Sequence, residues 1–289
     1  MAFRTIVIKN RCKLEYSLNY LVYRGEEEKK ILIDEIEVLI IQNTSVSLTA
    51  ALLSELVEKK VKVIFCDTKN NPQFEMVPYT NNYCSYKKIM NQVSISQDLK
   101  NIIWQKIIYR KLYTESKLLK KLDNSAFLKL DNYLKEIEPG DLTNREGHAA
   151  KVYFNALFGE DFSRRDPNNT INKYLNYGYS IIVSAINREL KIFGMLLEVG
   201  IHHIGETNPF NFSYDLIEPL RSYIDSFVVL KKVNEENFKN EFQKILTNQV
   251  ICDGKSMYLD NAIHIYIQSV VNALTNGNVE DIKFIDYEL

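Results

Sequence analysis

The residue types best suited to chemistry lie together between Gly200 and Arg221. His202 and His203 are two of the four histidines in the 289-residue chain, and a loop with Gly, Asn and Pro residues follows them. Asp215 and Glu218 come next, three residues apart, a spacing that places both carboxylates on one face of a helix. One interpretation is a metal or catalytic site. The other is two solvated acids that complement a helix dipole, preceded by two ordinary loop histidines.

The helix that carries these carboxylates has an unusual start. Ser213 is predicted to cap it by accepting a backbone N–H, and apolar residues then recur at helical spacing from Leu216 to Phe227. Pro219 lies in the first turns and has no N–H to donate to the carbonyl oxygen of Asp215, so it is expected to strain or kink the helix. A helix-breaking residue beside two carboxylates favours a site over a plain surface.

A third carboxylate, Glu146, opens another predicted helix. Residues 144–158 have the pattern of a helix packed on a core, with apolar residues from Ala149 to Leu157, and Gly159 ends the pattern. Glu146 lies one turn before Ala149 and shares its face. A carboxylate on an apolar face must be paired, protonated or bound to a cation, unless it stays solvated in the first turn and complements the helix dipole.

These residues form one candidate donor set of carboxylates and a single imidazole: Glu146, His203, Asp215 and Glu218. Such a set suits Mg²⁺ or Mn²⁺ better than zinc, for which cysteines or several regularly spaced histidines are expected. The sequence alone does not show that these side chains meet in space.

Three segments resemble the signature blocks of the CRISPR-associated integrase, the catalytic subunit of the spacer-acquisition complex. They are residues 144–158, which open with Asn-Arg-Glu-Gly-His-Ala-Ala, residues 172–180, which contain Asn-Tyr-Gly-Tyr, and residues 200–221. The family pattern places a His twelve residues before the Asp of an Asp-Leu-x-Glu-Pro-x-Arg run, and that count selects His203 rather than His202. The wording of the first and third blocks is similar to the type II branch, and the resemblance spans essentially the whole chain.

The resemblance implies a metal-dependent DNA integrase of CRISPR adaptation with metal-dependent endonuclease activity, a component of defence against foreign DNA. Glu146, His203 and Glu218 are expected to bind one Mg²⁺ or Mn²⁺ ion, with Asp215 as a fourth ligand or as a group that supports the ligands. The 3′-hydroxyl of a captured DNA fragment would attack the repeat array by direct transesterification. Because a ligand histidine must be neutral, activity is expected to fall as the pH drops towards the usual imidazole pKa of about 6.5 or below it.

The resemblance also implies partners. They are double-stranded DNA, as captured fragment and repeat array, and a small ferredoxin-like adaptation subunit that bridges homodimers of this chain. In type II systems the effector nuclease and, in some branches, a ring-shaped DNA-end-binding protein are expected as well.

Three alternatives remain open at this stage. The first is a structure-specific nuclease that cleaves branched DNA with the same ligands, and the second is a non-catalytic DNA-binding scaffold with structural carboxylates. The third is a small-molecule metal hydrolase built on His202 and His203, which leaves the Glu146 segment unexplained.

Composition restricts the class of protein. A net charge of −1, from 36 basic and 37 acidic residues, argues against general adhesion to nucleic acid. No apolar run is long enough to span a membrane and the N-terminus lacks a signal-peptide core, so a cytoplasmic location is expected. The resemblance implies that the cell is prokaryotic. Four scattered cysteines without C-x-x-C spacing are predicted to be reduced, structural thiols: Cys12, Cys66, Cys84 and Cys252.

The hydrophobic patterns predict an α+β, multidomain chain. Residues 1–80 favour strands, with one helix at 44–59; residues 81–95 are expected to link them to a helical domain at 96–289. The resemblance makes the first domain a β-sandwich-like dimerisation domain and the second an all-α catalytic domain.

Within the second domain, Ser96 is predicted to cap a long helix that ends near Leu122 and has a basic polar side including Lys111. Further helices are predicted at 172–193, 235–246 and 256–274, with Asp253-Gly254 as a turn and a loose acidic tail from 276. His264 is expected to be a satisfied core or interface histidine.

Local basic residues are candidates for DNA contact. Phosphate groups would be held by such side chains without sequence reading. The candidates are Arg145, Arg164, Arg165, Arg221 and Lys255.

Overall fold

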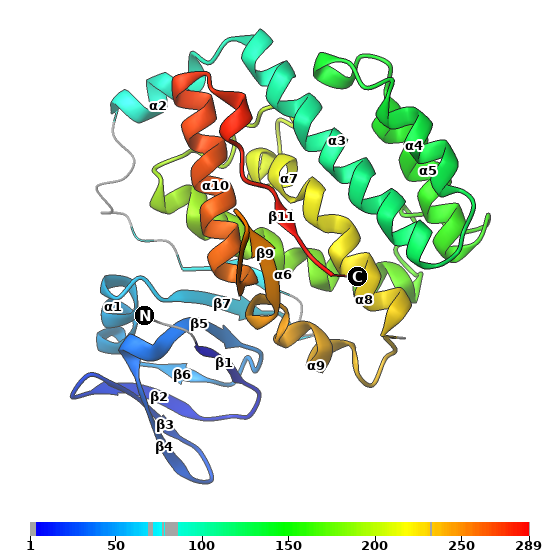
Figure 1. The fold of residues 1–289 in the computed structure, drawn as a ribbon. Helices are drawn as coiled ribbons and strands as arrows, with labels where there is room; N and C mark the ends of the chain where they lie inside the picture. Colours follow the sequence, from blue (N-terminus) through cyan, green and yellow to red (C-terminus); the bar gives the residue numbers. More distant parts are fainter. Residues whose placement is uncertain (1–3, 69–71, 77, 79–85, 232, 289) are drawn as a thin grey trace. The chain divides into compact units, whose positions relative to one another are not determined.

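A computed structural model describes residues 4–68, 72–76, 78, 86–231 and 233–288. The chain is α+β and divides into two compact units, one made of residues 1–81 with 242–247, the other of 82–241 with 248–289 (Figure 1). Within the described ranges, no helix has both the length and the apolar character needed to cross a membrane.

The first unit contains two four-stranded sheets, ordered β4-β3-β2-β6 and β1-β5-β7-β8. Strands β2, β3 and β4 pair antiparallel, whereas β1, β5 and β7 pair parallel. The elements are β1 (Arg4–Ile8), β2 (Lys13–Ser17), β3 (Tyr20–Arg24), β4 (Glu28–Leu32), η1 (Ile33–Glu35), β5 (Ile36–Ile41), β6 (Ser47–Leu48), α1 (Ala50–Glu58), β7 (Lys62–Cys66) and β8 (Pro72–Glu75).

Both sheets contribute to one hydrophobic core in this unit. Leu14 and Leu21 come from one sheet, Leu39 and Val63 from the other, and Leu52 from α1; all five side chains are fully buried. Strand β5 is buried at every position but Glu37, as its almost continuous apolar run predicts for a strand covered on both faces. The predicted sandwich-like arrangement of the first unit is therefore confirmed.

The predicted helix at 44–59 is too long. Helix α1 begins at Ala50, after Thr49, whose hydroxyl accepts a hydrogen bond from the Leu52 N–H at 3.3 Å. Residues before it form β6 instead, because they pair in parallel with Lys13 and Leu14 of β2. Strand β8 was also missed, because its segment has a turn-rich composition. It is a strand because it pairs antiparallel with β7, which ends at Cys66.

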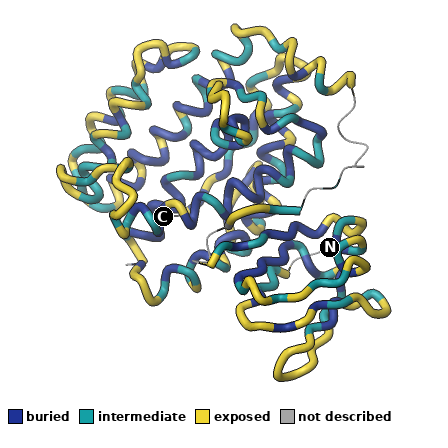
Figure 2. The backbone as a smooth tube through the Cα atoms, turned by 180° about the vertical axis from the view of Figure 1, so that it is seen from behind, coloured by how far each residue is buried: buried dark blue, intermediate teal, exposed yellow. Residues whose placement is uncertain are grey.

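Helices build most of the second unit (Figures 1 and 2). They are α2 (Tyr86–Val93), α3 (Gln97–Lys121), α4 (Phe127–Leu134), η2 (Pro139–Asp141), α5 (Arg145–Phe158), α6 (Thr170–Ile192), α7 (Asn211–Ile217), η3 (Glu218–Leu220), α8 (Arg221–Leu230), α10 (Leu259–Asn276) and η5 (Val279–Asp281). Helix α9 (Phe238–Gln243) and η4 (Ile245–Thr247) replace the longer helix predicted at 235–246. The predicted cap of α3 is confirmed, because Ser96 Oγ accepts the Leu99 N–H at 3.3 Å.

The second unit is not all-α as predicted. A three-stranded antiparallel sheet, ordered β10-β9-β11, joins β9 (Gln249–Cys252), β10 (Lys255–Tyr258) and β11 (Ile285–Asp286). Asp253 and Gly254, both with positive φ (50° and 72°), form the predicted turn between β9 and β10. These strands are so short that their alternation is hard to detect in the sequence.

Part of the predicted linker and the end of the chain form defined structure. Residues 81–95 were predicted as a linker, yet α2 lies within them and the Gln92 amide donates to the carbonyl oxygens of Leu196 and Val199 at 2.9 and 2.8 Å. The tail was predicted to be loose, yet Ile285 and Tyr287 are buried and the Tyr287 hydroxyl lies 2.7 Å from that of Ser222. In both cases tertiary contacts order a segment with a weak local pattern.

Candidate active site

Glu146, His203 and Glu218 all line one open cavity of about 1000 Å³ in the second unit. They come from three places in the chain: the first turn of α5, the loop before α7, and the 3₁₀ turn η3. Lys111 and the three arginines Arg164, Arg165 and Arg221 line the same cavity. Three of the side chains proposed from the sequence as ligands therefore line the same cavity.

The start of α5 is fixed by two polar side chains. Asn144, in the left-handed region (φ 51°), accepts the Gly147 N–H at 3.2 Å through its side chain. The buried carboxylate of Asp141 accepts the backbone N–H groups of Arg145 and Glu146 at 2.8 and 2.9 Å. Asp141 was missed in the sequence, although an acid shortly before a helix start is a recognisable capping signal.

The predicted interruption at Pro219 is confirmed, because the 3₁₀ turn Glu218–Leu220 separates α7 from α8. The predicted cap at Ser213 is wrong: α7 already begins at Asn211, and the buried Ser213 hydroxyl donates to Asn187 Oδ1. Because the Ser213 hydroxyl already donates to a buried acceptor on α6, it does not cap the start of α7.

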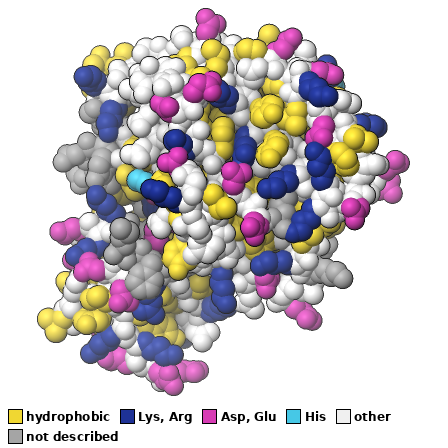
Figure 3. Space-filling view, viewed as in Figure 1, with side chains coloured by type: hydrophobic (Ala, Val, Ile, Leu, Met, Phe, Trp, Pro, Cys, Tyr) yellow, Lys and Arg dark blue, Asp and Glu magenta, His cyan; other side chains and the backbone are white. Residues whose placement is uncertain are grey.

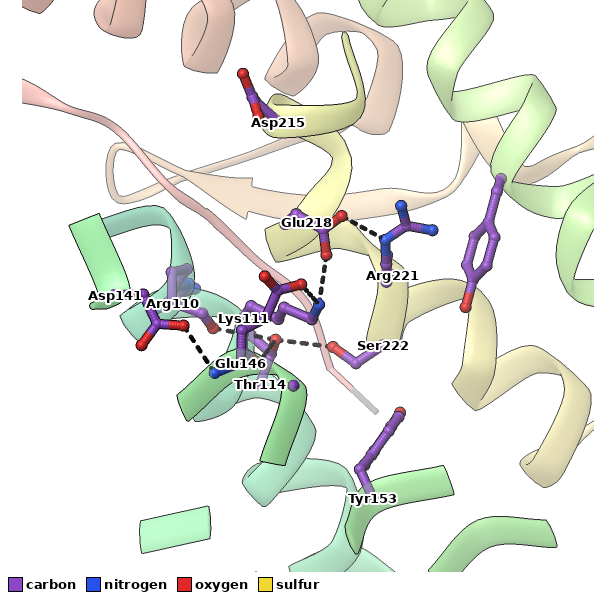
Figure 4. Close-up of polar contacts among 12 residues, drawn as sticks. Arg110, Lys111, Thr114, Asp141, Glu146, Tyr153, Asp215, Glu218, Arg221 and Ser222 are labelled. Carbon is purple, nitrogen blue, oxygen red and sulfur yellow. Dashed lines mark hydrogen bonds and ion pairs between the residues drawn. The ribbon is translucent and has the colours of Figure 1, made fainter. Parts of the chain in front are cut away.

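Lys111 lies between the two glutamates (Figure 4). Its ammonium is 2.6 Å from Glu146 Oε1 and 2.5 Å from Glu218 Oε2, and Arg221 Nε donates to Glu218 Oε1 at 2.8 Å. Lys111 was assigned to the basic polar side of its helix, but it is only 5% exposed, so that assignment is wrong. The helical pattern did not show that this face of α3 packs against η3 and α5.

The charges around Glu218 determine its protonation. Burial favours the neutral acid, but the Arg221 guanidinium and the Lys111 ammonium outweigh burial and lower the pKa of Glu218 to about 2. Burial likewise opposes the charged form of Lys111, but Glu218 and Glu146 raise the pKa of Lys111 above its usual value. Glu218 and Lys111 are therefore both charged at neutral pH.

Asp215 supports His203 rather than facing the cavity. Its fully buried carboxylate accepts the backbone N–H groups of Ile201, His202 and His203, and its Oδ1 lies 2.6 Å from His203 Nδ1. The contact with Asp215, opposed by burial, raises the pKa of His203 above its usual value. Of the two roles considered for Asp215, this geometry favours the supporting one.

The loop before α7 approaches Asp215 so closely that Gly200 is required there. A Cβ at this position would lie 2.6 Å from both Asp215 Oδ2 and the His203 carbonyl oxygen. On the other side, the Trp104 ring stacks on His202 at 4.2 Å and meets the edge of His203 at 5.8 Å. His202 thus packs on Trp104, and His203 is the one of the pair that lines the cavity.

The donor set fits a hard divalent cation. Two carboxylates and one imidazole face one cavity, and the buried Glu218 Oε2 already holds one cationic group, the Lys111 ammonium at 2.5 Å. Among the described residues, no three His, Cys, Asp or Glu side chains lie close enough together to hold a metal ion, because Lys111 lies between the two glutamates. Glu146, His203 and Glu218 would hold such a cation.

A buried carboxylate joins the helices around the site. Asp225 of α8 accepts hydrogen bonds from the hydroxyls of Tyr153 on α5, at 2.8 Å, and Tyr179 on α6. Burial, partly offset by the two tyrosine hydrogen bonds, raises the pKa of Asp225 to about 6. Nearby, burial also raises the pKa of Glu115 on α3 to about 8, although Lys111 opposes the shift.

The residues proposed for DNA contact fall in two groups. Arg164, Arg165 and Arg221 line the cavity, and Arg164 is positioned by the side chains of Asn172 and Asn176. Arg145 and Lys255 do not line it: Arg145 pairs with Glu136 at 3.1 Å, and Lys255 is exposed on β10.

His264 has a partner, as expected, since its Nδ1 lies 2.7 Å from Glu189 Oε2. Within the described residues, Cys12, Cys66 and Cys252 are buried and form no disulfide, while Cys84 lies outside those residues.

Comparison with known proteins identifies relatives over the whole chain. A family model described as CRISPR associated protein Cas1 matches residues 5–258. The curated CRISPR-associated endonuclease Cas1 of Neisseria meningitidis serogroup C (strain 8013) is 32% identical over 292 residues, covering 98% of this chain and 96% of that protein.

Solved structures show the same fold. A casposase bound to its integration product superimposes with a TM-score of 0.76 at 19% identity, covering 96% of this chain and 92% of that one. A Cas6-RT-Cas1–Cas2 complex matches with a TM-score of 0.73 at 16% identity, covering 96% of this chain and 36% of that one.

Proposed function

The chain belongs to the CRISPR-associated Cas1 family, and we propose on that basis that it is a divalent-metal-dependent DNA nuclease and integrase of CRISPR adaptation. The observation that carries this proposal is the convergence of Glu146, His203 and Glu218 on one cavity that is also lined by arginines. Carboxylates with an imidazole suit Mg²⁺ or Mn²⁺, and guanidinium groups suit phosphate oxygens.

When bound, the cation would polarise the scissile phosphate and stabilise charge on the departing 3′ oxygen. Glu146 and Glu218 would supply oxygen ligands, and neutral His203 would supply Nε2. Asp215 accepts the Nδ1–H of His203, which fixes the tautomer and the direction of the ring. Arg164 and Arg221 hold the phosphate oxygens of the DNA and position it.

The chemistry is a transfer of one phosphodiester linkage. The 3′-hydroxyl of a captured fragment forms a bond to a phosphorus atom of the repeat array, the bond from that phosphorus to the 3′ oxygen of the target strand breaks, and the leaving oxygen takes up a proton. With water as the nucleophile, the same site would cleave DNA. No covalent protein nucleophile is needed for either reaction.

Relatives support the choice of partners. One structural neighbour is a casposase bound to an integration product, and another is part of a complex that contains Cas2. We propose that this chain binds double-stranded DNA, forms homodimers, and assembles with the small ferredoxin-like Cas2 subunit. The type II effector nuclease and a ring-shaped DNA-end-binding protein remain proposals from the family.

A joining assay tests the proposal. A labelled duplex with free 3′-hydroxyl ends is incubated with a supercoiled plasmid carrying the cognate leader and repeat, in Mg²⁺, Mn²⁺ or EDTA, with and without the small subunit. Label should enter the plasmid at the repeat edges only when metal is present. Glu146→Gln and His203→Ala should each lower joining by about 100-fold or more, because each removes a metal ligand.

Glu160→Gln is the matched control. Glu160 lines the same cavity but is exposed and lies outside the proposed ligand set, so its substitution should leave joining intact. Nicking without joining would favour the branched-DNA nuclease, whereas joining by Glu146→Gln at the wild-type rate would refute the proposed ligands.

A further inference from the structure

The Lys111 ammonium occupies the place where a cation shared by the two glutamates would bind. It lies 2.6 Å from Glu146 Oε1 and 2.5 Å from Glu218 Oε2, and its side chain is 7% exposed. Metal–oxygen bonds to Mg²⁺ are about 2.1 Å long. A divalent ion on these oxygens and an ammonium on the same oxygens would therefore be within a few ångströms of each other and would repel strongly.

We propose that Lys111 is an internal counter-cation, which holds Glu146 and Glu218 together before metal binds and moves to Glu115 when it binds. The proposal rests on the metal site of the proposed function and adds a residue that is not a ligand. Without the ammonium, the two carboxylates would face each other across the site, and the guanidinium of Arg221 would neutralise Glu218 but not Glu146 directly.

Glu115 is suited to receive the ammonium. It lies four residues after Lys111 on α3, so the two side chains share one face of the helix. It is 1% exposed, and its Oε2 is buried without a hydrogen-bond partner among the described residues. Burial raises the pKa of Glu115 to about 8, so this acid is mainly neutral at pH 7 while Lys111 lies between the glutamates. The flexible four-carbon stem of lysine allows the ammonium to reach the buried Glu115 side chain, where its charge favours the ionised carboxylate.

The test measures metal binding by the full-length protein, without DNA. Trp104 is the single tryptophan of the chain and its ring lies 5.8 Å from that of His203, so its fluorescence should report Mn²⁺ bound at this site. Mn²⁺ titrations at one fixed pH give the Kd for the wild type, Lys111→Met and Glu115→Gln.

We expect Lys111→Met to bind Mn²⁺ at least about tenfold more tightly, because no ammonium has to be displaced. Glu115→Gln should bind at least about threefold more weakly, because the displaced ammonium loses a carboxylate partner and meets only a neutral amide oxygen. Lys117→Met is the matched control: Lys117 is an exposed lysine of the same helix, and its loss should leave the Kd within about twofold of the wild type.

Thermal melting provides a second measurement. In EDTA, Lys111→Met should melt below the wild type, and Mn²⁺ should raise its Tm by more than it raises the wild-type Tm. If the Lys111→Met variant does not fold, Lys111→Gln is measured in its place. If the wild type binds Mn²⁺ and neither Lys111 variant binds more tightly, the inference is refuted while the proposed function stands. An unchanged Kd for Glu115→Gln refutes the transfer, and no Mn²⁺ binding by the wild type refutes both the metal site and the inference.

Discussion

The properties of His203 depend on the residue behind it. Asp215 lies 2.6 Å from His203 Nδ1 and also holds the loop backbone through three N–H groups. This contact leaves Nε2 as the nitrogen available to a cation and raises the pKa of the imidazole. The Asp215 carboxylate therefore orients the His203 ring, but it also raises the pH that is needed to keep His203 neutral.

A pH profile tests this balance. Since a ligand imidazole must be neutral and its pKa is raised, the joining rate at subsaturating Mn²⁺ should fall to half at a pH above the usual value of about 6.5. Asp215→Asn removes the main contact that raises the pKa, so its acid limb should lie at lower pH. Single-turnover rates between about pH 5.5 and 8.5 measure both limbs. Acid limbs at the same pH in the two proteins would contradict the assigned contact.

At the scale of elements, the site depends on how α5 begins. Asp141 accepts two backbone N–H groups at this start, including that of Glu146, so it positions the carboxylate through the main chain. Asp141→Ala should lower the free energy of unfolding by about 1–2 kcal/mol and also lower joining, because the first turn that carries Glu146 is freed. Denaturant unfolding and the joining assay measure the two effects.

Thr49→Ala is the control for loss of a helix cap. Thr49 caps α1 in the first unit, where its hydroxyl accepts the Leu52 N–H. This variant should lose a similar amount of stability and keep its joining activity. Equal losses of joining in the two variants would show that Asp141 acts only through general stability.

The carboxylate shared by three helices makes stability depend on pH. The pKa of Asp225 is raised to about 6, so the folded state binds a proton more readily than the unfolded state does. Its contribution to stability should therefore fall as the pH rises from about 4 to 6 and change little above that range. Asp225→Asn, which does not titrate, should gain on the order of 2 kcal/mol relative to the wild type over this window.

Denaturant unfolding at several pH values measures this difference for the wild type and Asp225→Asn. A difference that is constant between about pH 4 and 7 would contradict the assigned shift. Tyr153→Phe removes one of the two hydroxyl donors and should cost about 1–2 kcal/mol at any pH in this range.

At the scale of the molecule, charge is spread rather than concentrated. On the face shown in Figure 3, Lys and Arg side chains are interspersed with Asp and Glu, in agreement with the net charge of −1. Several basic side chains of α3 are already paired, such as Lys106 with Glu280 and Lys120 with Asp131. We therefore expect productive DNA binding to depend on the arginine-lined cavity, the metal ion and partner subunits.

We expect the chain to be a homodimer, because joining at both ends of a repeat requires two sites. The hairpin of β2 and β3 in the first unit exposes apolar side chains, with Leu18 at 87%. Leu18→Glu should shift the mass measured by light scattering towards the monomer. Leu128→Glu, at a 57% exposed position of α4, should leave the dimer intact. A wild type that is monomeric at micromolar concentration would contradict the prediction.

Much of the fold could be predicted from periodicity. The strand-like pattern of residues 1–80, the long apolar stripe after Ser96 and the break at Pro219 are local signals, and each marks elements found in the structure. Two short strands were missed: β8, which pairs with the preceding strand β7, and β11, which pairs with the distant strand β9. A strand of two to four residues has too little local pattern to be recognised without its neighbour.

By itself, the sequence determined the two-part organisation, the family resemblance and the choice of Glu146, His203 and Glu218, because helical spacing and motif order are properties of the chain. Only the tertiary structure decided what surrounds these residues. It showed that Lys111, expected on the basic polar side of its helix, pairs with Glu146 and Glu218, and that the Asp215 carboxylate contacts His203. Such contacts join residues from separate helices and loops, and their energies depend on burial, which no local pattern encodes.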